Sequence, residues 1–127
     1  MDTSLKNKRI LFVEDDEANQ YYMQLLFEEI GCAFELASNG QEAVEKARKA
    51  KFNIIFMDLR MPVMDGFETA QAIRKDIDKD VLIVAVSANV LTDVIDKCLA
   101  VGMNGFIAKG IEVEKFEKEM LSWLAKS

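Results

Sequence analysis

The apolar run IIFM at residues 54–57, which ends in Asp58, constrains the fold of this chain more than any other feature. An unbroken run of this kind is typical of a strand that is buried on both faces, as strands are in a parallel sheet. The segment that follows, residues 58–66, holds the only proline of the chain and an Asp-Gly pair. Ligands of open α/β sheets bind at the carboxyl ends of the strands, so the sequence places Asp58 at a candidate binding site.

Apolar strand segments alternate with helical segments along the whole chain. The strands are expected at residues 8–13, 32–37, 53–57, 81–86 and 105–108. The helices are expected at residues 17–30, 41–49, 67–75, 90–101 and 113–125. This alternation predicts an α/β fold with a doubly wound, five-stranded parallel sheet in the flavodoxin-like order 2-1-3-4-5 and helices on both faces. The 127 residues suit a single domain, 1–127, with a core at about residues 8–125.

The first helix, residues 17–30, is expected to bury a broad apolar stripe. Its members are Tyr21, Tyr22, Leu25, Leu26, Phe27 and Ile30. Gly31 ends the helix as a C′ glycine would, and either Asp15 or Asp16 can cap its start. Of these two acids we favour Asp16 as the cap.

Composition excludes several classes of function. The net charge of −6 argues against direct binding of nucleic acid. The chain has no histidine, which removes histidine-based catalysis and any role as a phosphohistidine donor. No apolar run approaches the about 20 residues that span a bilayer, and the polar start is no secretory signal, so we expect a cytoplasmic protein without membrane contact. Cys32 and Cys98 lie far apart and are expected to pack as small hydrophobes.

Polar residues follow the strands at what should be the same edge of the sheet. They are Glu14, Asp15 and Asp16 after the first strand, Asp58 after the third, Ser87 after the fourth and Lys109 after the fifth. In the order 2-1-3-4-5 the first and third strands are neighbours at the crevice where ligands bind. The acids of the first strand should therefore face Asp58, with Ser87 and Lys109 on the other side.

Several carboxylates in one crevice repel each other and need a cation. Oxygen ligands in an accessible site suit Mg²⁺, for which we expect Mn²⁺ to substitute. Lys109 and Ser87 would complete a site for a phosphoryl group by neutralising and orienting its oxygens. Asp58 is the natural covalent acceptor, because its loop leaves it central.

These residues lie in segments that resemble a response-regulator receiver domain, the phosphoacceptor module of two-component and phosphorelay signalling. The segments are ILFVEDDEANQ (10–20), IIFMDLRMPVMDG (54–66), VAVSAN (84–89) and CLAVGMNGFIAKG (98–110). The resemblance covers essentially the full length. The first and last of these segments are most similar to receivers attached to hybrid sensor kinases.

The resemblance implies that Asp58 takes a phosphoryl group from a phosphohistidine on a histidine kinase or a histidine phosphotransfer protein. The receiver would catalyse its own phosphorylation and dephosphorylation without being an enzyme in the usual sense. Asp15 should bind Mg²⁺ directly and Glu14 mainly through water. Asp58 and the backbone carbonyl of Arg60 should supply further ligands.

The resemblance also assigns roles to residues around the acceptor. Ser87 matches the switch hydroxyl and Lys109 the phosphate-binding lysine. Phe106 matches the aromatic switch position, although a plain core aromatic is an equally good interpretation. Arg60 and Asn89 would border the path of the water that hydrolyses the acyl phosphate, and so tune its lifetime. The family usually has proline after the lysine, joined by a cis bond, whereas this chain has Gly110. A cis bond without proline costs about 2.5–4 kcal/mol, which favours the trans form, but the sequence leaves both forms open.

Two alternatives belong to other classes. A receiver-like interaction module that does not signal by phosphorylation would fit the same fold, but the complete acid, serine and lysine set argues against it. A flavin-binding protein would need a phosphate-cradling loop where this chain has EDDE, and a haloacid-dehalogenase-type phosphatase would need an acid in place of Arg60. No output domain is recognisable, so the chain is either a stand-alone receiver or a domain of a longer protein, such as a hybrid kinase.

Overall fold

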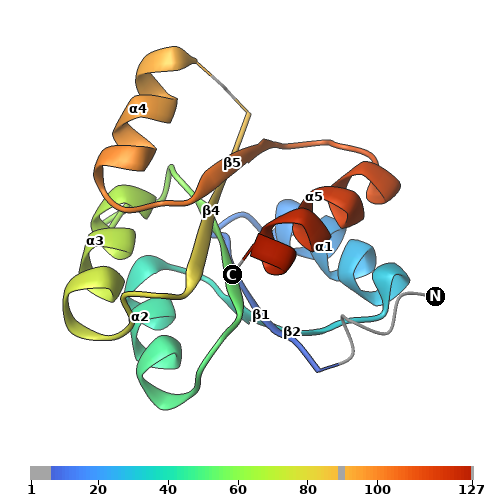
Figure 1. The fold of residues 1–127 in the computed structure, drawn as a ribbon, viewed down its shortest axis with the longest axis horizontal. Helices are drawn as coiled ribbons and strands as arrows, with labels where there is room; N and C mark the ends of the chain where they lie inside the picture. Colours follow the sequence, from blue (N-terminus) through green and yellow to red (C-terminus); the bar gives the residue numbers. More distant parts are fainter. Residues whose placement is uncertain (1–6, 89–90, 127) are drawn as a thin grey trace.

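A parallel sheet forms the centre of the molecule (Figure 1). The computed structural model describes residues 7–88 and 91–126. The strands are β1 (Arg9–Val13), β2 (Ala33–Ala37), β3 (Ile54–Asp58), β4 (Leu82–Ser87) and β5 (Gly105–Ala108). They pair in the order β2-β1-β3-β4-β5, with every neighbouring pair parallel. This order confirms the predicted doubly wound topology, including the edge position of the second strand.

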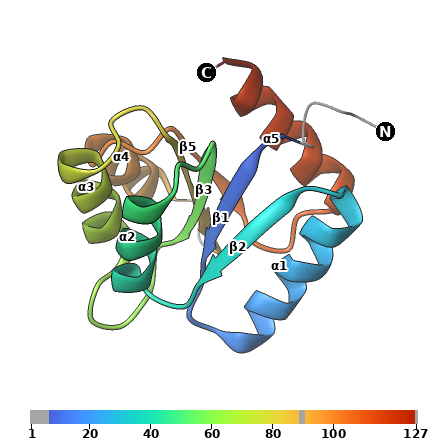
Figure 2. The ribbon, with the colours of Figure 1, turned by 90° about the horizontal axis from the view of Figure 1, so that it is seen from below.

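Helices cover both faces of the sheet (Figure 2). They are α1 (Glu17–Ile30), α2 (Gly40–Lys49), α3 (Gly66–Asp76), α4 (Thr92–Ala100) and α5 (Val113–Lys126). Helices α1 and α5 lie on one side, and α2, α3 and α4 lie on the other. The chain leaves β1 toward one face and β3 toward the other, so the ends of these two strands flank the crevice of the sheet.

The central strands are buried on both faces, as their continuous apolar runs predict. On β1, Ile10 and Phe12 pack in the apolar cluster with α1 and α5, whereas Leu11 and Val13 pack in the cluster with α2, α3 and α4. The same alternation holds along β3 and β4. Two cores thus hold the sheet from either side and fix the register of its strands.

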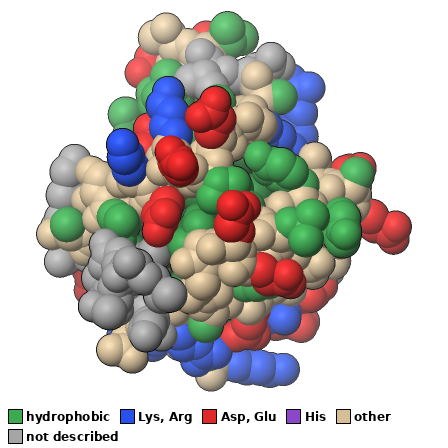
Figure 3. All heavy atoms as spheres, turned by 90° about the vertical axis from the view of Figure 1, so that its right-hand side faces the viewer, with side chains coloured by type: hydrophobic (Ala, Val, Ile, Leu, Met, Phe, Trp, Pro, Cys, Tyr) green, Lys and Arg blue, Asp and Glu red, His purple; other side chains and the backbone are tan. Residues whose placement is uncertain are grey.

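One side of α1 is more exposed than the sequence predicts. Tyr21, Tyr22 and Leu25 are 63%, 42% and 47% exposed, so their expected place in a buried stripe is wrong. Met23 takes their place in the core, at 6% exposure. A helix that packs on a single sheet buries only a narrow stripe, and these three side chains lie beyond it. On the face that carries α1 and α5, hydrophobic and acidic side chains lie side by side (Figure 3).

The ends of the helices follow local chemistry. Asp16 caps α1 by accepting a hydrogen bond from the backbone N–H of Asn19, as predicted, and Gly31 closes that helix with a φ of 87°. Asp65 begins α3 in a capping box with Glu68. The start predicted for the fourth helix, Val90, lies outside the described residues. Within the described parts of the chain, no helix is long and apolar enough to cross a membrane.

Candidate functional site

The pairing of β1 with β3 brings two acids together at the carboxyl edge of the sheet. Val13 lies opposite Met57 in the register of the two strands. The next residue of each strand is an acid, so Glu14 and Asp58 emerge side by side. They line a cleft of about 250 Å³ whose other side chains include Asp15, Ser87 and Lys109. The structure thus assembles the side chains that the sequence places at this edge.

The carboxylates of this cleft differ sharply in exposure. Glu14 is 1% exposed and Asp58 is 4% exposed, whereas Asp15 is exposed to solvent. One oxygen from each of these three residues lies within 4.8 Å of the others. Burial of two neighbouring carboxylates is costly unless positive charge compensates them.

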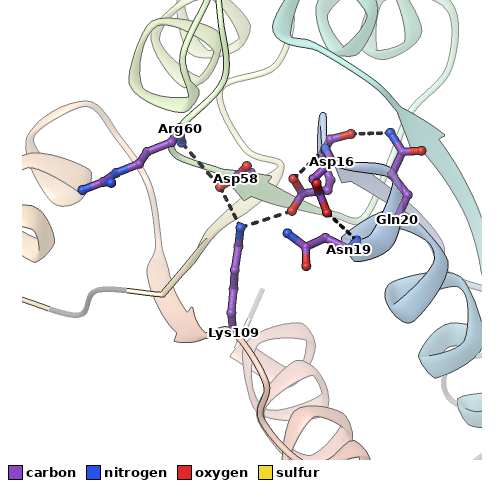
Figure 4. Close-up of polar contacts among 7 residues, drawn as sticks. Asp16, Asn19, Gln20, Asp58, Arg60 and Lys109 are labelled. Atoms are coloured by element: carbon purple, nitrogen blue, oxygen red, sulfur yellow. Dashed lines mark hydrogen bonds and ion pairs between the residues drawn. The ribbon is translucent and has the colours of Figure 1, made fainter.

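Lys109 supplies positive charge to both buried acids (Figure 4). Its Nζ lies 3.3 Å from Oε1 of Glu14 and 3.3 Å from Oδ1 of Asp58. The backbone N–H of Lys109 donates to the carbonyl of Ser87 at 3.0 Å, which holds the end of β5 beside β4. Lys109 therefore reaches across the sheet edge to the opposite wall of the cleft.

The cluster perturbs the protonation of its members. Burial raises the pKa of Glu14 from 4.5 to about 7, and the charge of Asp58 adds to the effect, while a hydrogen bond from the Asp16 backbone opposes it. Burial also disfavours charge on Lys109, but the carboxylates of Asp58 and Glu14 outweigh it and raise the lysine pKa. The raised pKa of Glu14 thus follows mainly from its burial, and the raised pKa of Lys109 from the two carboxylates that it faces.

The residues present fit a divalent cation with oxygen ligands. Oε2 of Glu14 accepts a hydrogen bond from the backbone N–H of Asp16 at 3.1 Å. Its buried Oε1 makes no hydrogen bond with any described group, although the charge of Lys109 lies nearby. A buried acceptor of this kind calls for a further partner, and Asp15 and Asp58 bring two more carboxylates within reach. A carboxylate set open to water is the environment that Mg²⁺ prefers.

Side chains of α1 support the acidic strand end. Gln20 donates from Nε2 to the backbone carbonyl of Glu14 at 2.7 Å, and the N-cap bond of Asp16 to the Asn19 N–H fixes the start of the helix (Figure 4). The role of Gln20 escapes sequence analysis, because an amide in the first helical turn carries no spacing signal of its own. Asp16 acts as the cap, as predicted.

The loop after β3 is tied closely to Asp58. A Cβ at Gly66 would collide with the backbone carbonyl of Asp58, so this glycine lets α3 begin against the strand end. The backbone N–H of Arg60 faces Oδ1 of Asp58 at 3.4 Å, a long contact. The side chain of Arg60 extends away from Asp58 toward solvent (Figure 4).

The remaining predicted residues have different outcomes. Ser87 is partly buried and lines the cleft beside Lys109. Phe106 is 36% exposed, so its interpretation as a plain core aromatic is wrong. Asn89 lies outside the described residues. Gly110 has a φ of 82°, and no cis peptide bond occurs in the described chain, so the bond after Lys109, which the sequence left open, is trans.

Comparison with known proteins identifies what this arrangement resembles. The sequence model of one family, the response regulator receiver domain, matches residues 10–121. The chain is 39% identical to hybrid signal transduction histidine kinase B of Dictyostelium discoideum, over 93% of the chain and 7% of that protein. It is 36% identical to the osmosensing histidine protein kinase SLN1 of Saccharomyces cerevisiae, over 98% of the chain and 10% of that protein. The chain thus spans only a small part of these relatives.

Solved structures share the fold closely. The receiver domain of sensor histidine kinase PA1611 from Pseudomonas aeruginosa, which has a magnesium ion coordinated in its active site cleft, superposes with a TM-score of 0.85. It is 31% identical, and the match covers 93% of this chain and 98% of that one. The receiver domain of the Saccharomyces cerevisiae response regulator Ssk1, solved with the phosphotransfer protein Ypd1, also reaches 0.85 at 29% identity, covering 95% of this chain and 91% of that one.

Proposed function

The chain belongs to the response regulator receiver family, and from this premise we propose that it is a Mg²⁺-dependent phosphoacceptor switch whose acceptor is Asp58. The observation that carries the proposal is the meeting of Asp58 with Glu14, Asp15 and Lys109 in one cleft. The proposed unit is the whole chain as one receiver domain. It is a signalling module of a two-component phosphorelay, and we propose that it catalyses its own phosphorylation and dephosphorylation.

The proposed donor is a phosphohistidine on a histidine kinase or a histidine phosphotransfer protein. An oxygen of Asp58 attacks the phosphorus in line, and a P–O bond forms as the P–N bond to the imidazole breaks. The electron pair of the broken P–N bond stays on the imidazole nitrogen. Solvent supplies any proton that the ring then lacks, so the donor histidine is released in its neutral form. A phosphoryl group then sits on Asp58 as a mixed anhydride.

The cleft residues divide the work of this transfer. Glu14, Asp15 and Asp58 would hold the Mg²⁺, with the backbone carbonyl of Arg60 as a further proposed ligand. When bound, Mg²⁺ supplies positive charge to the oxygens of the transferring group. Lys109, already within 3.3 Å of Asp58, would bind another phosphoryl oxygen. With a cation bound in the acidic cluster, the negative charge of Glu14 would no longer depend on Lys109. The lysine ammonium could then bind a phosphoryl oxygen instead.

Release of the signal follows from hydrolysis of the same bond. Water attacks the phosphorus, inorganic phosphate leaves and the carboxylate of Asp58 is restored. Arg60 and Asn89 are proposed to tune this step from the rim of the cleft. Ser87 is proposed to bind the phosphoryl group, and the half-exposed ring of Phe106 to change its packing in response.

The similar proteins support a phosphorelay partner. The relatives at 39% and 36% identity are hybrid or osmosensing histidine kinases, and the Ssk1 receiver was solved with its phosphotransfer protein. We propose that this chain exchanges phosphoryl groups with a partner of that class, as a stand-alone receiver or as a domain of a hybrid kinase. The proposed compartment is the cytoplasm, and the proposed metal is Mg²⁺, with Mn²⁺ as a substitute.

A receiver-like module that binds partners without phosphorylation is the competing hypothesis. Phosphoramidate separates the two, because it carries the P–N bond of a phosphohistidine in the simplest form. The switch hypothesis predicts a gain of one phosphoryl group, measured by intact mass, when the chain meets phosphoramidate with Mg²⁺. The Asp58→Asn variant and a sample with excess chelator should gain none. A folded wild-type chain that gains no phosphoryl group would favour the interaction module.

A further inference from the structure

The segment between β5 and α5, residues 109–112, has little to fix it in its own sequence. Gly110 has a φ of +82°, and the place of a Cβ at this residue has no neighbour within 4 Å. Glycine is the residue with the greatest backbone freedom, so it contributes least to holding a loop in one conformation. Contacts from elsewhere in the fold must supply what this loop lacks.

Lys109 nevertheless needs a defined position. Its Nζ must reach two carboxylates at once, and both lie 3.3 Å away on the far wall of the cleft. On its N-terminal side the lysine is held by the bond from its backbone N–H to the Ser87 carbonyl. On its C-terminal side stands Gly110. The next fixed point along the chain therefore decides how firmly the lysine backbone is held.

That fixed point is a hydrogen bond from α1. The hydroxyl of Tyr22 donates to the backbone carbonyl of Ile111 at 3.1 Å, between residues 89 apart in the sequence. The side chain of Ile111 packs against the apolar cluster beneath α1 and α5. Tyr22, Gly110, Ile111 and Phe116 also line a small cavity of about 40 Å³, so the loop lies directly against the helix. The tether thus combines one polar bond with apolar contact.

The helix that carries this hydroxyl also begins at the acidic end of β1. Helix α1 starts at Glu17, directly after Glu14, Asp15 and Asp16, and Gln20 of its first turn holds the Glu14 carbonyl. The same rigid element therefore sets the position of the acids and of the loop that follows the lysine. We propose that Tyr22 is a positioning residue for Lys109, and that its hydroxyl holds the loop of residues 109–112 so that the lysine meets the phosphoryl group. This inference rests on the proposed phosphoacceptor function.

Tyr22→Phe tests the inference, because it removes the hydroxyl and keeps the ring. Tyr21→Phe is the matched control, since it makes the same chemical change on the next residue of the helix, which is 63% exposed. The first readout is the rate of phosphorylation by phosphoramidate at saturating Mg²⁺. Loss of one neutral hydrogen bond should slow this rate about three- to tenfold in Tyr22→Phe. Tyr21→Phe should match the wild type.

Two further readouts separate positioning from a general effect on the fold. The Mg²⁺ affinity of Tyr22→Phe, measured by titration calorimetry, should stay within about twofold of the wild type, because the hydroxyl bonds the loop after Lys109 and Tyr22 is not among the residues that line the cleft. In a Lys109→Ala background, Tyr22→Phe should leave the residual phosphorylation rate within about twofold, because its target is gone. An undiminished effect of Tyr22→Phe without the lysine would overturn the inference.

Hydrogen exchange tests whether the Tyr22 hydroxyl holds residues 109–112, and it needs no phosphorylation. The amides of residues 109–112 should exchange about three- to tenfold faster in Tyr22→Phe than in the wild type or in Tyr21→Phe. Unchanged exchange of these amides would overturn the inference, as would an unchanged phosphorylation rate in an active protein. A wild-type chain that takes no phosphoryl group would instead defeat the proposed function, and the exchange rates would still decide whether Tyr22 holds the loop.

Discussion

Lys109 and Glu14 form an ion pair across the cleft, with Nζ of the lysine 3.3 Å from Oε1 of the glutamate. The glutamate side chain is only 1% exposed, whereas the lysine side chain is 28% exposed. One partly solvated ammonium therefore compensates Glu14 and also Asp58, which lies at the same distance from it. Without metal, one lysine ammonium thus faces two buried carboxylates, and the net charge of this group of three is negative when both acids are ionised.

The stability of the metal-free chain should fall as pH rises through the titration of Glu14. The folded chain holds the glutamate proton up to about pH 7, whereas the unfolded chain releases it near pH 4.5. The unfolded state therefore binds fewer protons between these values, and the free energy of unfolding decreases there with rising pH. A difference of one in the pKa between the two states corresponds to about 1.4 kcal/mol, so the total loss amounts to a few kcal/mol. Denaturant unfolding with excess chelator, from pH 4 to 8, measures it.

Glu14→Gln should remove the loss of unfolding free energy that deprotonation of Glu14 causes. This variant should therefore unfold less readily than the wild type at pH 8 without metal. The matched control is Glu17→Gln, which neutralises an exposed carboxylate in the first turn of α1 and should keep the pH dependence of the wild type. If Glu14→Gln unfolds with the pH dependence of the wild type, Glu14 does not carry the proton.

Adjacent acids should have separable roles in metal binding and in stability. Asp15→Asn should lower the Mg²⁺ affinity about tenfold or more, because it removes one carboxylate from the cluster of three. Asp16→Ala should instead cost about 1 kcal/mol of stability, because it removes the N-cap of α1. Titration calorimetry gives the affinity and denaturant unfolding gives the stability. An Asp16→Ala chain that binds Mg²⁺ as weakly as Asp15→Asn would contradict this division.

The fold was predictable from the chain because its strands are buried on both faces. Continuous apolar runs such as residues 54–57 mark central strands, and the polar residues that follow them reveal which strand ends share an edge. The strand order then brings Glu14 beside Asp58, as the register of Val13 with Met57 shows. These features depend on short segments and on general rules of βαβ connection.

Features that depend on distant contacts were not predictable. The helical period of α1 suggests a wide apolar stripe, but only the packing of the sheet and α5 decides that Met23 is buried and Tyr21 exposed. The hydrogen bond from Tyr22 to Ile111 joins residues that are 89 apart in the sequence, and neither residue type predicts it. The deep burial of Glu14 likewise depends on distant segments, because the end of β1 lies between β2 and β3, whereas Asp15 lies past the strand end and is exposed.

Arg60 should lengthen the life of the phosphorylated state. Its side chain lines the cleft and now extends toward solvent, from where it can turn toward a dianionic phosphoryl group. Arg60→Ala should shorten the phosphoryl half-life about two- to fivefold, the effect expected of one partly exposed charge. Decay of the phosphorylated chain after removal of the donor measures it. Arg48→Ala, on α2, is the control for loss of a cation elsewhere, and an unchanged half-life in Arg60→Ala would refute the role.

The identity of the phosphorylated residue tests the central claim most directly. The chain is phosphorylated with phosphoramidate and Mg²⁺ and then treated with borohydride, which reduces an aspartyl phosphate to homoserine. Peptide mass spectrometry should place the homoserine at position 58 in the wild type, and find none in Asp58→Asn or in a sample with chelator. A stable phosphoryl group on another residue, or a folded wild-type chain without homoserine at position 58, would contradict the account.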